Sequence, residues 1–212
     1  MSDISIQKRI GYTDKVIDHF TNPRNAGRIE NPDITAKVGS VACGDLIKLY
    51  LKIDPESNRI EDIKFESYGC AANIATSSIL TELAKGKTVD EAKKITFKDI
   101  AEELGGLPKI KMHCAVLSST GLSVALLKYE AKKGLVKIDE AFVRRVLRGV
   151  LDPIEGTDIV SAGILESVKI EDKTITLKLK AQEGSELAKS IEEDTKESFE
   201  GLGIDLKFVY SS

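Results

Sequence analysis

The chain has 212 residues, of which 42% are hydrophobic and 31% are charged, and its formal net charge is −3. This length allows one large domain or two small ones, and the composition excludes collagen-like, low-complexity and wholly disordered chains. No run approaches the ~18 consecutive apolar residues of a membrane span, and the lysines are interleaved with acidic residues, so we expect contact with neither membrane nor nucleic acid.

The first two-thirds of the chain predict a helix, a hairpin and a series of further helices. Apolar residues recur at helical spacing over residues 12–20. Residues 46–53 alternate apolar and polar side chains, as a half-buried strand does, and residues 63–67 resume the alternation after a turn, which predicts a β-hairpin. Helical signals then cover residues 71–85, 88–91, 96–104 and 112–133.

The pattern restarts after Gly134 and predicts a second, smaller unit. Asp139 is a suitable N-cap for a helix that ends before Pro153. Two alternating runs, a helix and a final alternating run follow, at residues 163–170, 174–180, 185–201 and 204–210. We therefore predict an α+β protein of two domains, residues 1–135 and 136–212, the second with the order αββαβ. From Asp139 onward there are 10 basic and 16 acidic residues, which indicates that the two domains present different surfaces.

Cysteine is the most informative residue type, with Cys43, Cys70 and Cys114. Their odd number, and a wide spacing without a C-x-x-C motif, argue against both a disulfide framework and a zinc ribbon. The amino terminus also lacks the apolar segment of a signal peptide, so we expect a cytoplasmic protein. Each cysteine lies at a junction of predicted elements, where side chains can converge on a shared site.

Three thiolates and one further donor would make a four-ligand metal site. Asp45 lies two residues after Cys43, and His113 directly precedes Cys114. Cys70 and Cys114 begin predicted helices, where exposed N–H groups and the helix dipole favour the thiolate. Thiolates suit both iron–sulfur clusters and zinc, imidazole suits either, and a carboxylate oxygen is a harder and weaker partner. The residues alone leave both metals open.

The two histidines allow other interpretations. His19, on the first predicted helix, is expected to be a solvated or half-buried side chain rather than a ligand. An enzyme with Cys114 as nucleophile and His113 as base is disfavoured, because adjacent residues on a helix point ~100° apart, which makes a hydrogen-bonded pair difficult.

Five segments resemble the IscU/NifU-type iron–sulfur cluster scaffolds in their order and spacing. They read TDKVIDHFTNPRNAGRIE, ACGDLIKLYLKI, YGCAANIATSSILTELAKGKTVDEA, DIAEELGGLP and KMHCAVL. The resemblance spans about residues 11–132 and implies a three-stranded antiparallel sheet with packed helices. It also implies a scaffold rather than an enzyme. Such a scaffold receives persulfide sulfur from a cysteine desulfurase, binds iron, builds a [2Fe-2S] cluster and passes it to apo iron–sulfur proteins.

The resemblance assigns the assembly site to Cys43, Asp45, Cys70, His113 and Cys114. It implies that the three cysteines and Asp45 bind metal, with His113 as the alternative fourth ligand, and that Cys114 accepts the persulfide sulfur. An oxygen ligand keeps part of the site exchangeable, as release of the cluster requires. Tyr12 matches a family tyrosine implicated in the pairing of scaffolds, which allows a homodimer. Zinc is a candidate metal for the scaffold without its cluster. The alternative function is a zinc-binding sulfur acceptor, with Cys43, Asp45, Cys70 and Cys114 on the zinc ion.

One segment departs from the family. Residues 107–111 read Leu-Pro-Lys-Ile-Lys, whereas members served by a dedicated DnaK-type chaperone carry Leu-Pro-Pro-Val-Lys. The missing second proline removes stiffness toward an extended conformation, which argues against docking of such a chaperone.

The second predicted domain resembles the small iron–sulfur assembly domain of SufT-type proteins and of the start of Mrp-type ATPases. The resemblance lies in VLRGVLDPIEGTDIVSAGILESVKIEDKTITLKLK. That family often places Cys-Pro after the second strand, where this chain has Gly184 and Ser185. Because no cysteine follows Cys114, this domain supplies no thiolate ligand. We interpret it as a docking or delivery element, and its turn at Asp152 and Pro153 as structural.

Overall fold

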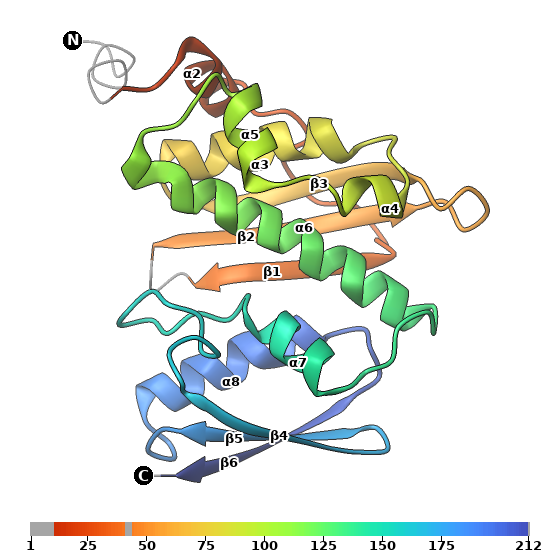
Figure 1. The fold of residues 1–212 in the computed structure, drawn as a ribbon, viewed down its shortest axis with the longest axis vertical. Helices are drawn as coiled ribbons and strands as arrows, with labels where there is room; N and C mark the ends of the chain where they lie inside the picture. Colours follow the sequence, from red (N-terminus) through yellow and green to blue (C-terminus); the bar gives the residue numbers. More distant parts are fainter. Residues whose placement is uncertain (1–10, 41–43, 212) are drawn as a thin grey trace.

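The computed structural model describes residues 11–40 and 44–211, so Cys43 lies outside the described residues. Within them, two three-stranded sheets are stacked, with helices between and around them (Figure 1). We call residues 11–133 the first module and residues 139–211 the second module. One cluster of buried apolar side chains runs through both modules.

The first sheet is antiparallel and has the strand order β1-β2-β3. Its strands are β1 (Ile34–Ser40), β2 (Asp45–Ile53) and β3 (Ile60–Tyr68). Two long helices pack against it, α3 (Ala71–Ala84) on β3 and α6 (Met112–Lys132) on β1 and β2. The shorter helices are α2 (Asp14–Thr21), α4 (Val89–Ala92), α5 (Phe97–Glu103) and the 3-10 turn η2 (Lys109–Lys111). The implied sheet with packed helices is thus confirmed.

The sequence patterns missed strand β1. Ile34, Ala36 and Val38 alternate toward the core and are buried. An alanine and a following glycine give this segment a weak strand signal, so its pairing with β2 is what defines it. The glycine, Gly39, has a φ of +88°, and a Cβ there would lie 2.2 Å from the carbonyl oxygen of Asp45. No larger residue fits at this end of the sheet.

The second module has the predicted order of helix, two strands, helix and strand. Its elements are α7 (Glu140–Leu147), β4 (Leu165–Glu171), β5 (Thr174–Lys180), α8 (Glu186–Phe199) and β6 (Asp205–Ser211). Strand β5 pairs with β4 in antiparallel and with β6 in parallel orientation. Asp139, the predicted N-cap, accepts a hydrogen bond from the backbone N–H of Phe142 at the start of α7. Helices α7 and α8 lie between the two sheets (Figure 1).

Ion pairs between the modules bring opposite charges together. Lys37 on β1 lies 2.7 Å from Asp194 on α8 and also pairs with Glu197. Lys48 on β2 lies 3.6 Å from Glu197. Asp194 is buried, and one of its carboxylate oxygens has no hydrogen-bond partner among the described residues. The acidic second module therefore meets lysines of the first module at this contact.

Helix α6 is the central helix of the first module. By length and composition alone, residues 109–132 could cross a membrane, a test that a core helix also passes. In this fold the helix packs against β1, β2, α3 and α5. Its Lys128 is fully buried and donates a hydrogen bond to the carbonyl oxygen of Thr35 at 2.8 Å. Burial lowers the pKa of Lys128 to about 8.

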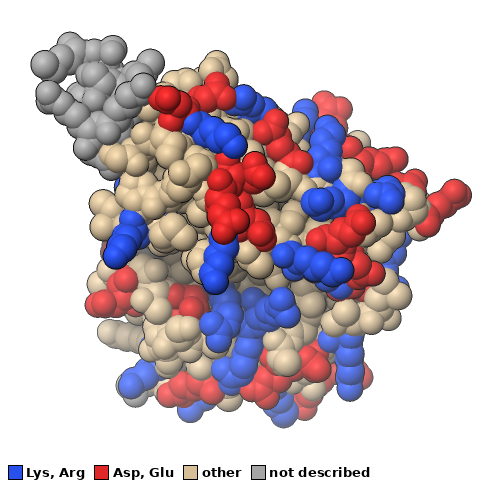
Figure 2. Space-filling model, turned by 45° about the horizontal axis from the view of Figure 1, so that its top comes forward, with Lys and Arg blue, Asp and Glu red and all other residues tan. Residues whose placement is uncertain are grey.

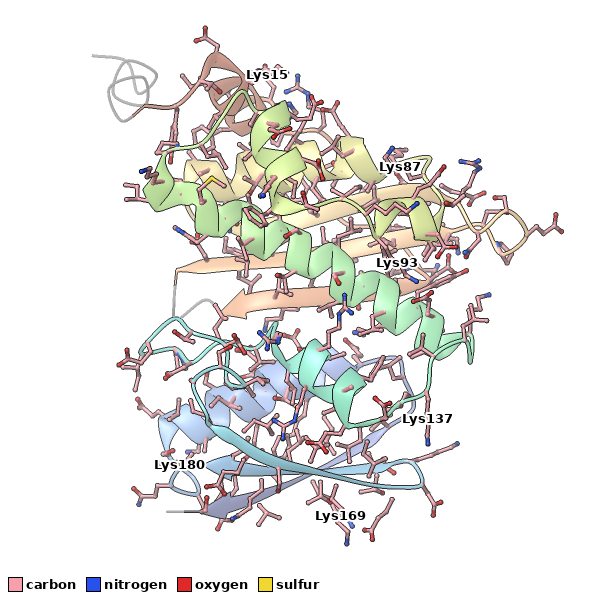
Figure 3. All side chains as sticks on the ribbon, in the orientation of Figure 1. Lys15, Lys87, Lys93, Lys137, Lys169 and Lys180 are labelled. Carbon is pink, nitrogen blue, oxygen red and sulfur yellow. The ribbon has the colours of Figure 1, made fainter. Side chains whose placement is uncertain are left out.

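Charged side chains cover the outside of both modules. On the face shown in Figure 2, basic and acidic residues are interleaved over most of the surface. Figure 3 labels six lysines on the two modules, namely Lys15, Lys87, Lys93, Lys137, Lys169 and Lys180. These six are spread along the molecule rather than gathered at one place.

Candidate functional site

Two of the cysteines meet at one end of the first module. Cys70 is the N-cap of α3, and Cys114 is the third residue of α6. Their sulfur atoms are 3.7 Å apart, although 44 residues separate them in the chain. Cys70 is half-buried, whereas Cys114 is 0% exposed. The structure therefore brings this pair of thiols together, while Cys43 lies outside the described residues.

Asp45, the first residue of β2, links the cysteines to His113. One of its carboxylate oxygens lies 3.1 Å from His113 Nε2, and the other accepts a hydrogen bond from the backbone N–H of Cys70 at 3.4 Å. Gly69 makes room for the carboxylate, because a Cβ there would lie 2.3 Å from Asp45 Oδ1. Donor atoms of Asp45, His113 and Cys114 all lie within 4.8 Å of one another. These residues form one cluster of oxygen, nitrogen and sulfur donors.

The contact between His113 and Cys114 corrects one expectation. His113 Nε2 lies 3.4 Å from Cys114 Sγ, although the two residues are adjacent on α6. Both belong to the first turn, where side chains lean toward the helix N-terminus, and an imidazole ring is long enough to reach back over the neighbouring thiol. The expectation that the helix keeps this pair from interacting is wrong.

The pKa values of the two cysteine thiols are shifted in opposite directions. The pKa of the Cys70 thiol is lowered to about 5, because Cys114 donates a hydrogen bond to its sulfur; burial opposes the shift and the backbone N–H of Asn73 supports it. The same hydrogen bond, together with burial, raises the pKa of Cys114. The two thiols therefore titrate as a pair, in which loss of the first proton is eased and loss of the second is hindered. The expectation that a helix start favours the thiolate stays a prediction for both cysteines.

Lys111 and Tyr12 border the Cys70 thiolate. Burial lowers the pKa of Lys111, but the negative charges of Cys70 and Tyr12 oppose this, and the net shift is upward. Tyr12 is buried, and burial, followed by the charge of Cys70, raises its pKa. A cation and a phenol are thus held beside the two sulfur atoms. The role of Tyr12 in pairing of scaffolds stays a prediction.

His19 belongs to a different part of the first module. Its Nδ1 lies 2.8 Å from Ser78 Oγ on α3, and its Nε2 lies 3.6 Å from Glu82. Burial lowers the pKa of its imidazole. The expectation of a solvated or half-buried side chain is wrong, because the packing of α2 on α3 leaves His19 only 6% exposed.

The second module supplies a wall beside the donor cluster. A pocket of about 480 Å³ opens next to Asp45 and His113, lined by α6 on one side and by residues from 148 to 158 on the other. In Figure 1 the loop after α7 lies on the same side of the molecule as the first turn of α6. Sequence reasoning did not find this wall, because no local pattern signals a contact between segments so far apart in the chain.

Comparison with known proteins establishes the family of this chain. Residues 11–136 match the family described as NifU-like N terminal domain, and residues 140–203 match the family described as iron-sulfur cluster assembly protein. The first match covers more than half of the chain. The chain therefore belongs to the NifU-like N terminal domain family, and its second module matches a further iron–sulfur family.

Relatives with known names match the first module. The iron-sulfur cluster assembly scaffold protein IscU 1 of Archaeoglobus fulgidus is 57% identical over 129 residues, which are 61% of this chain and 82% of that protein. The scaffold protein IscU of Azotobacter vinelandii is 48% identical over 130 residues, 60% of this chain and 100% of that protein. Among solved structures, the N-terminal part of a NifU-like protein from Brucella abortus is 21% identical, covers 58% of this chain and 97% of that one, and has a TM-score of 0.45.

Proposed function

We propose that this protein is a scaffold on which [2Fe-2S] clusters are built from iron and from the persulfide sulfur of a cysteine desulfurase. The finished clusters pass to apo iron–sulfur proteins. The observation that carries the proposal is the approach of Cys70, Cys114, Asp45 and His113 in one cluster of donors. Membership of the NifU-like family supports it, as do the names of the relatives. The match of the second module supports a role for that module in the same process.

In this proposal, Cys43, Cys70, Cys114 and Asp45 hold the iron, and His113 is the alternative fourth ligand. Thiolates suit iron–sulfur chemistry, whereas a carboxylate oxygen is a harder and weaker donor. Because Asp45 and His113 lie 3.1 Å apart, oxygen and nitrogen compete for the same position on the cluster. Such a position stays exchangeable, as a protein that releases its cargo requires.

Cys114, the proposed sulfur acceptor, must become a thiolate before it reacts. Its sulfur then attacks the outer sulfur of the donor persulfide, so that a new S–S bond forms, the donor's S–S bond breaks and the donor cysteine leaves as a thiolate. No electrons are gained or lost overall. His113 Nε2, 3.4 Å from Cys114 Sγ, is placed to take the Cys114 proton and to return it to the leaving thiolate.

The alternative of a zinc-binding sulfur acceptor finds no support in the comparisons, since the named relatives are iron–sulfur cluster scaffold proteins. Pairing of two scaffolds through Tyr12 and a cytoplasmic location are further parts of the proposal. The departure at residues 107–111 argues against docking of a DnaK-type chaperone.

Anaerobic reconstitution of the full chain tests the proposal. With iron, a cysteine desulfurase and cysteine, we expect visible absorption bands and equal amounts of bound iron and acid-labile sulfide. Cys114→Ser should lose sulfur acceptance, whereas Ser119→Ala, further along the same helix, should behave as the wild type. A colourless protein with stoichiometric zinc would contradict the proposal. Persulfide on Cys114→Ser at the wild-type level would refute the role of Cys114.

A further inference from the structure

The pocket beside the donor cluster has the dimensions of a small-molecule site. Its volume of about 480 Å³ is typical of pockets that enclose a ligand. One wall, from α6, is apolar around Val116 and Leu117, and the opposite wall is the loop of the second module that follows α7. The pocket opens directly on Asp45 and His113, the two donors that compete for the exchangeable position.

The wall from the second module carries one cation and one anion, Arg148 and Asp158. Arg148 is exposed, and its guanidinium makes no hydrogen bond or ion pair with the described residues, whereas those of Arg144 and Arg145 both do. Asp158 uses one carboxylate oxygen to accept the backbone N–H of Ser161 at 2.8 Å. A guanidinium binds a carboxylate, and a carboxylate binds an ammonium group, so this wall suits the two charges of a free α-amino acid.

The end of the pocket at Asp45 and His113 suits a thiol. A soft thiolate is a better ligand for iron in a cluster than a carboxylate oxygen. We infer that the pocket binds a free amino-acid thiol with the charge pattern of cysteine, whose thiol replaces Asp45 or His113 on the cluster. In this exchange the thiol sulfur bonds to iron and the displaced side chain takes up the thiol proton, so no electrons are transferred. The exchange rests on the proposed function, whereas binding in the pocket does not.

A free amino acid fits the pocket better than a cysteine within a partner protein. The α-amino and α-carboxyl groups of a cysteine inside a polypeptide are uncharged amides. Such a cysteine would leave Arg148 and Asp158 without the charges that they are placed to bind. Removal of Arg148 therefore distinguishes the two occupants.

Binding is tested on the full chain without iron, under anaerobic and reducing conditions. L-cysteine is added while the backbone amide signals of Thr120, Gly156 and Thr157 are followed by NMR. We expect saturable shifts, and binding about tenfold weaker, which is about 1.4 kcal/mol, in Arg148→Gln. Arg145→Gln is the matched control, because Arg145 lines a different cavity, and it should bind as the wild type does.

A capped compound decides which chemical groups are recognised. N-acetyl-L-cysteinamide has the thiol but neither charge, so it should bind about tenfold more weakly than L-cysteine, again about 1.4 kcal/mol. Equal binding of the capped compound would overturn the inference in favour of a peptide-borne cysteine. Equal binding of L-cysteine to the wild type and to Arg148→Gln would overturn it as well.

The exchange is tested on the full chain loaded with iron and sulfide. L-cysteine should change the visible absorption of the cluster, and L-serine, which has the same charges but no thiol, should not. The half-saturating concentration of L-cysteine should rise about tenfold in Arg148→Gln. If no cluster forms at all, the proposed function fails, and the NMR experiment still decides the pocket. If a cluster forms but L-cysteine acts equally on both proteins, the inference fails and the proposed function stands.

Discussion

Cys70 and Cys114 lie close enough for a hydrogen bond between their sulfur atoms, so their titrations are coupled. The hydrogen bond between the sulfur atoms, 3.7 Å apart, lowers the pKa of Cys70 and raises that of Cys114. A metal ion bound to Cys70 would add positive charge beside Cys114 and would therefore favour ionisation of the Cys114 thiol.

Asp45 is the residue at which cluster release can be tested. We expect Asp45→Ala to keep a bound cluster but to transfer it to an apo-ferredoxin about tenfold more slowly, which is about 1.4 kcal/mol in the barrier. The reason is that His113, freed from its contact with Asp45, can then occupy the fourth position as a better donor. Transfer is followed by the visible absorption of the ferredoxin. Glu61→Ala, an exposed acid on β3, is the control. Unchanged or faster transfer by Asp45→Ala would count against this role.

Residue types and junction positions were enough to nominate Cys70, Cys114, Asp45 and His113, and the family resemblance gave them roles. What lies around them was not predictable. Gly69 matters because of the space that the Asp45 carboxylate occupies, 2.3 Å from where a Cβ would lie. Such a constraint becomes visible only when the fold brings two distant segments into contact, because the local sequence of one segment does not indicate its contact with the other.

At the level of elements, strong periodicity and caps predicted the helices well. Strand β1 was missed, because its sequence has only a weak strand pattern. Its core residues, Ile34, Ala36 and Val38, are buried, but the alanine and a following glycine weaken the strand signal. The opposite face of β1 carries Lys37, which looks exposed in the sequence and is in fact covered by α8. A strand that lies between two modules has both faces covered, so its side chains do not alternate between a buried face and a solvent-exposed face.

The buried ammonium group of Lys128 on helix α6 destabilises the folded protein. The pKa of Lys128 is about 8 in the folded protein, against 10.5 ordinarily, so the unfolded state binds more protons between these values. The stability of the wild type therefore rises with pH in this window, and the cost of the buried charge is fully present below about pH 8. We expect Lys128→Met to raise the free energy of unfolding by about 2 kcal/mol at pH 7 and by less at pH 10.

Urea unfolding at both pH values measures this effect. Lys132→Met is the matched control, because Lys132 also donates to a backbone carbonyl, that of Asp33 at 2.9 Å, but at an exposed position. The control should change stability by less than about 1 kcal/mol. A Lys128→Met protein that is less stable than the wild type at pH 7 would show that the ammonium group has a net stabilising role.

At the scale of the whole molecule, the two modules share one buried core and a contact through α8 and β1. The αββαβ order was predicted from sequence, because it depends on local periodicity. The placement of the second module against the first was not, because it depends on surfaces that are far apart in the chain. As a consequence, the second module forms part of the pocket beside Asp45. Its role as a docking or delivery element stays a prediction.

Lys37 tests the contact between the modules. Lys37→Met would leave the buried Asp194 without its ammonium partner, which lies 2.7 Å away, and should reduce stability by about 3 kcal/mol at pH 7. Burial raises the pKa of Asp194 in the folded state, so the folded variant takes up a proton more readily than the unfolded chain. The loss should therefore shrink as the pH falls toward 4.

Unfolding at pH 7 and pH 4.5 is the measurement for this contact. Lys52→Met is the control, because Lys52 and Asp33 form a more exposed pair at 3.3 Å, whose loss should cost less than about 1 kcal/mol. Similar small losses in the two variants would show that the pair between the modules contributes no more than a surface pair.

Gly39 and Gly149 join the modules through their backbones. The N–H of Gly39 donates to the carbonyl oxygen of Gly149 at 2.9 Å, and a Cβ at Gly149 would lie 2.8 Å from Val38 Cγ1. With no side chain between them, there is no rotamer to absorb a displacement. A displacement of Gly149 would therefore act directly on the end of β1, where Ser40 pairs with Asp45 of β2.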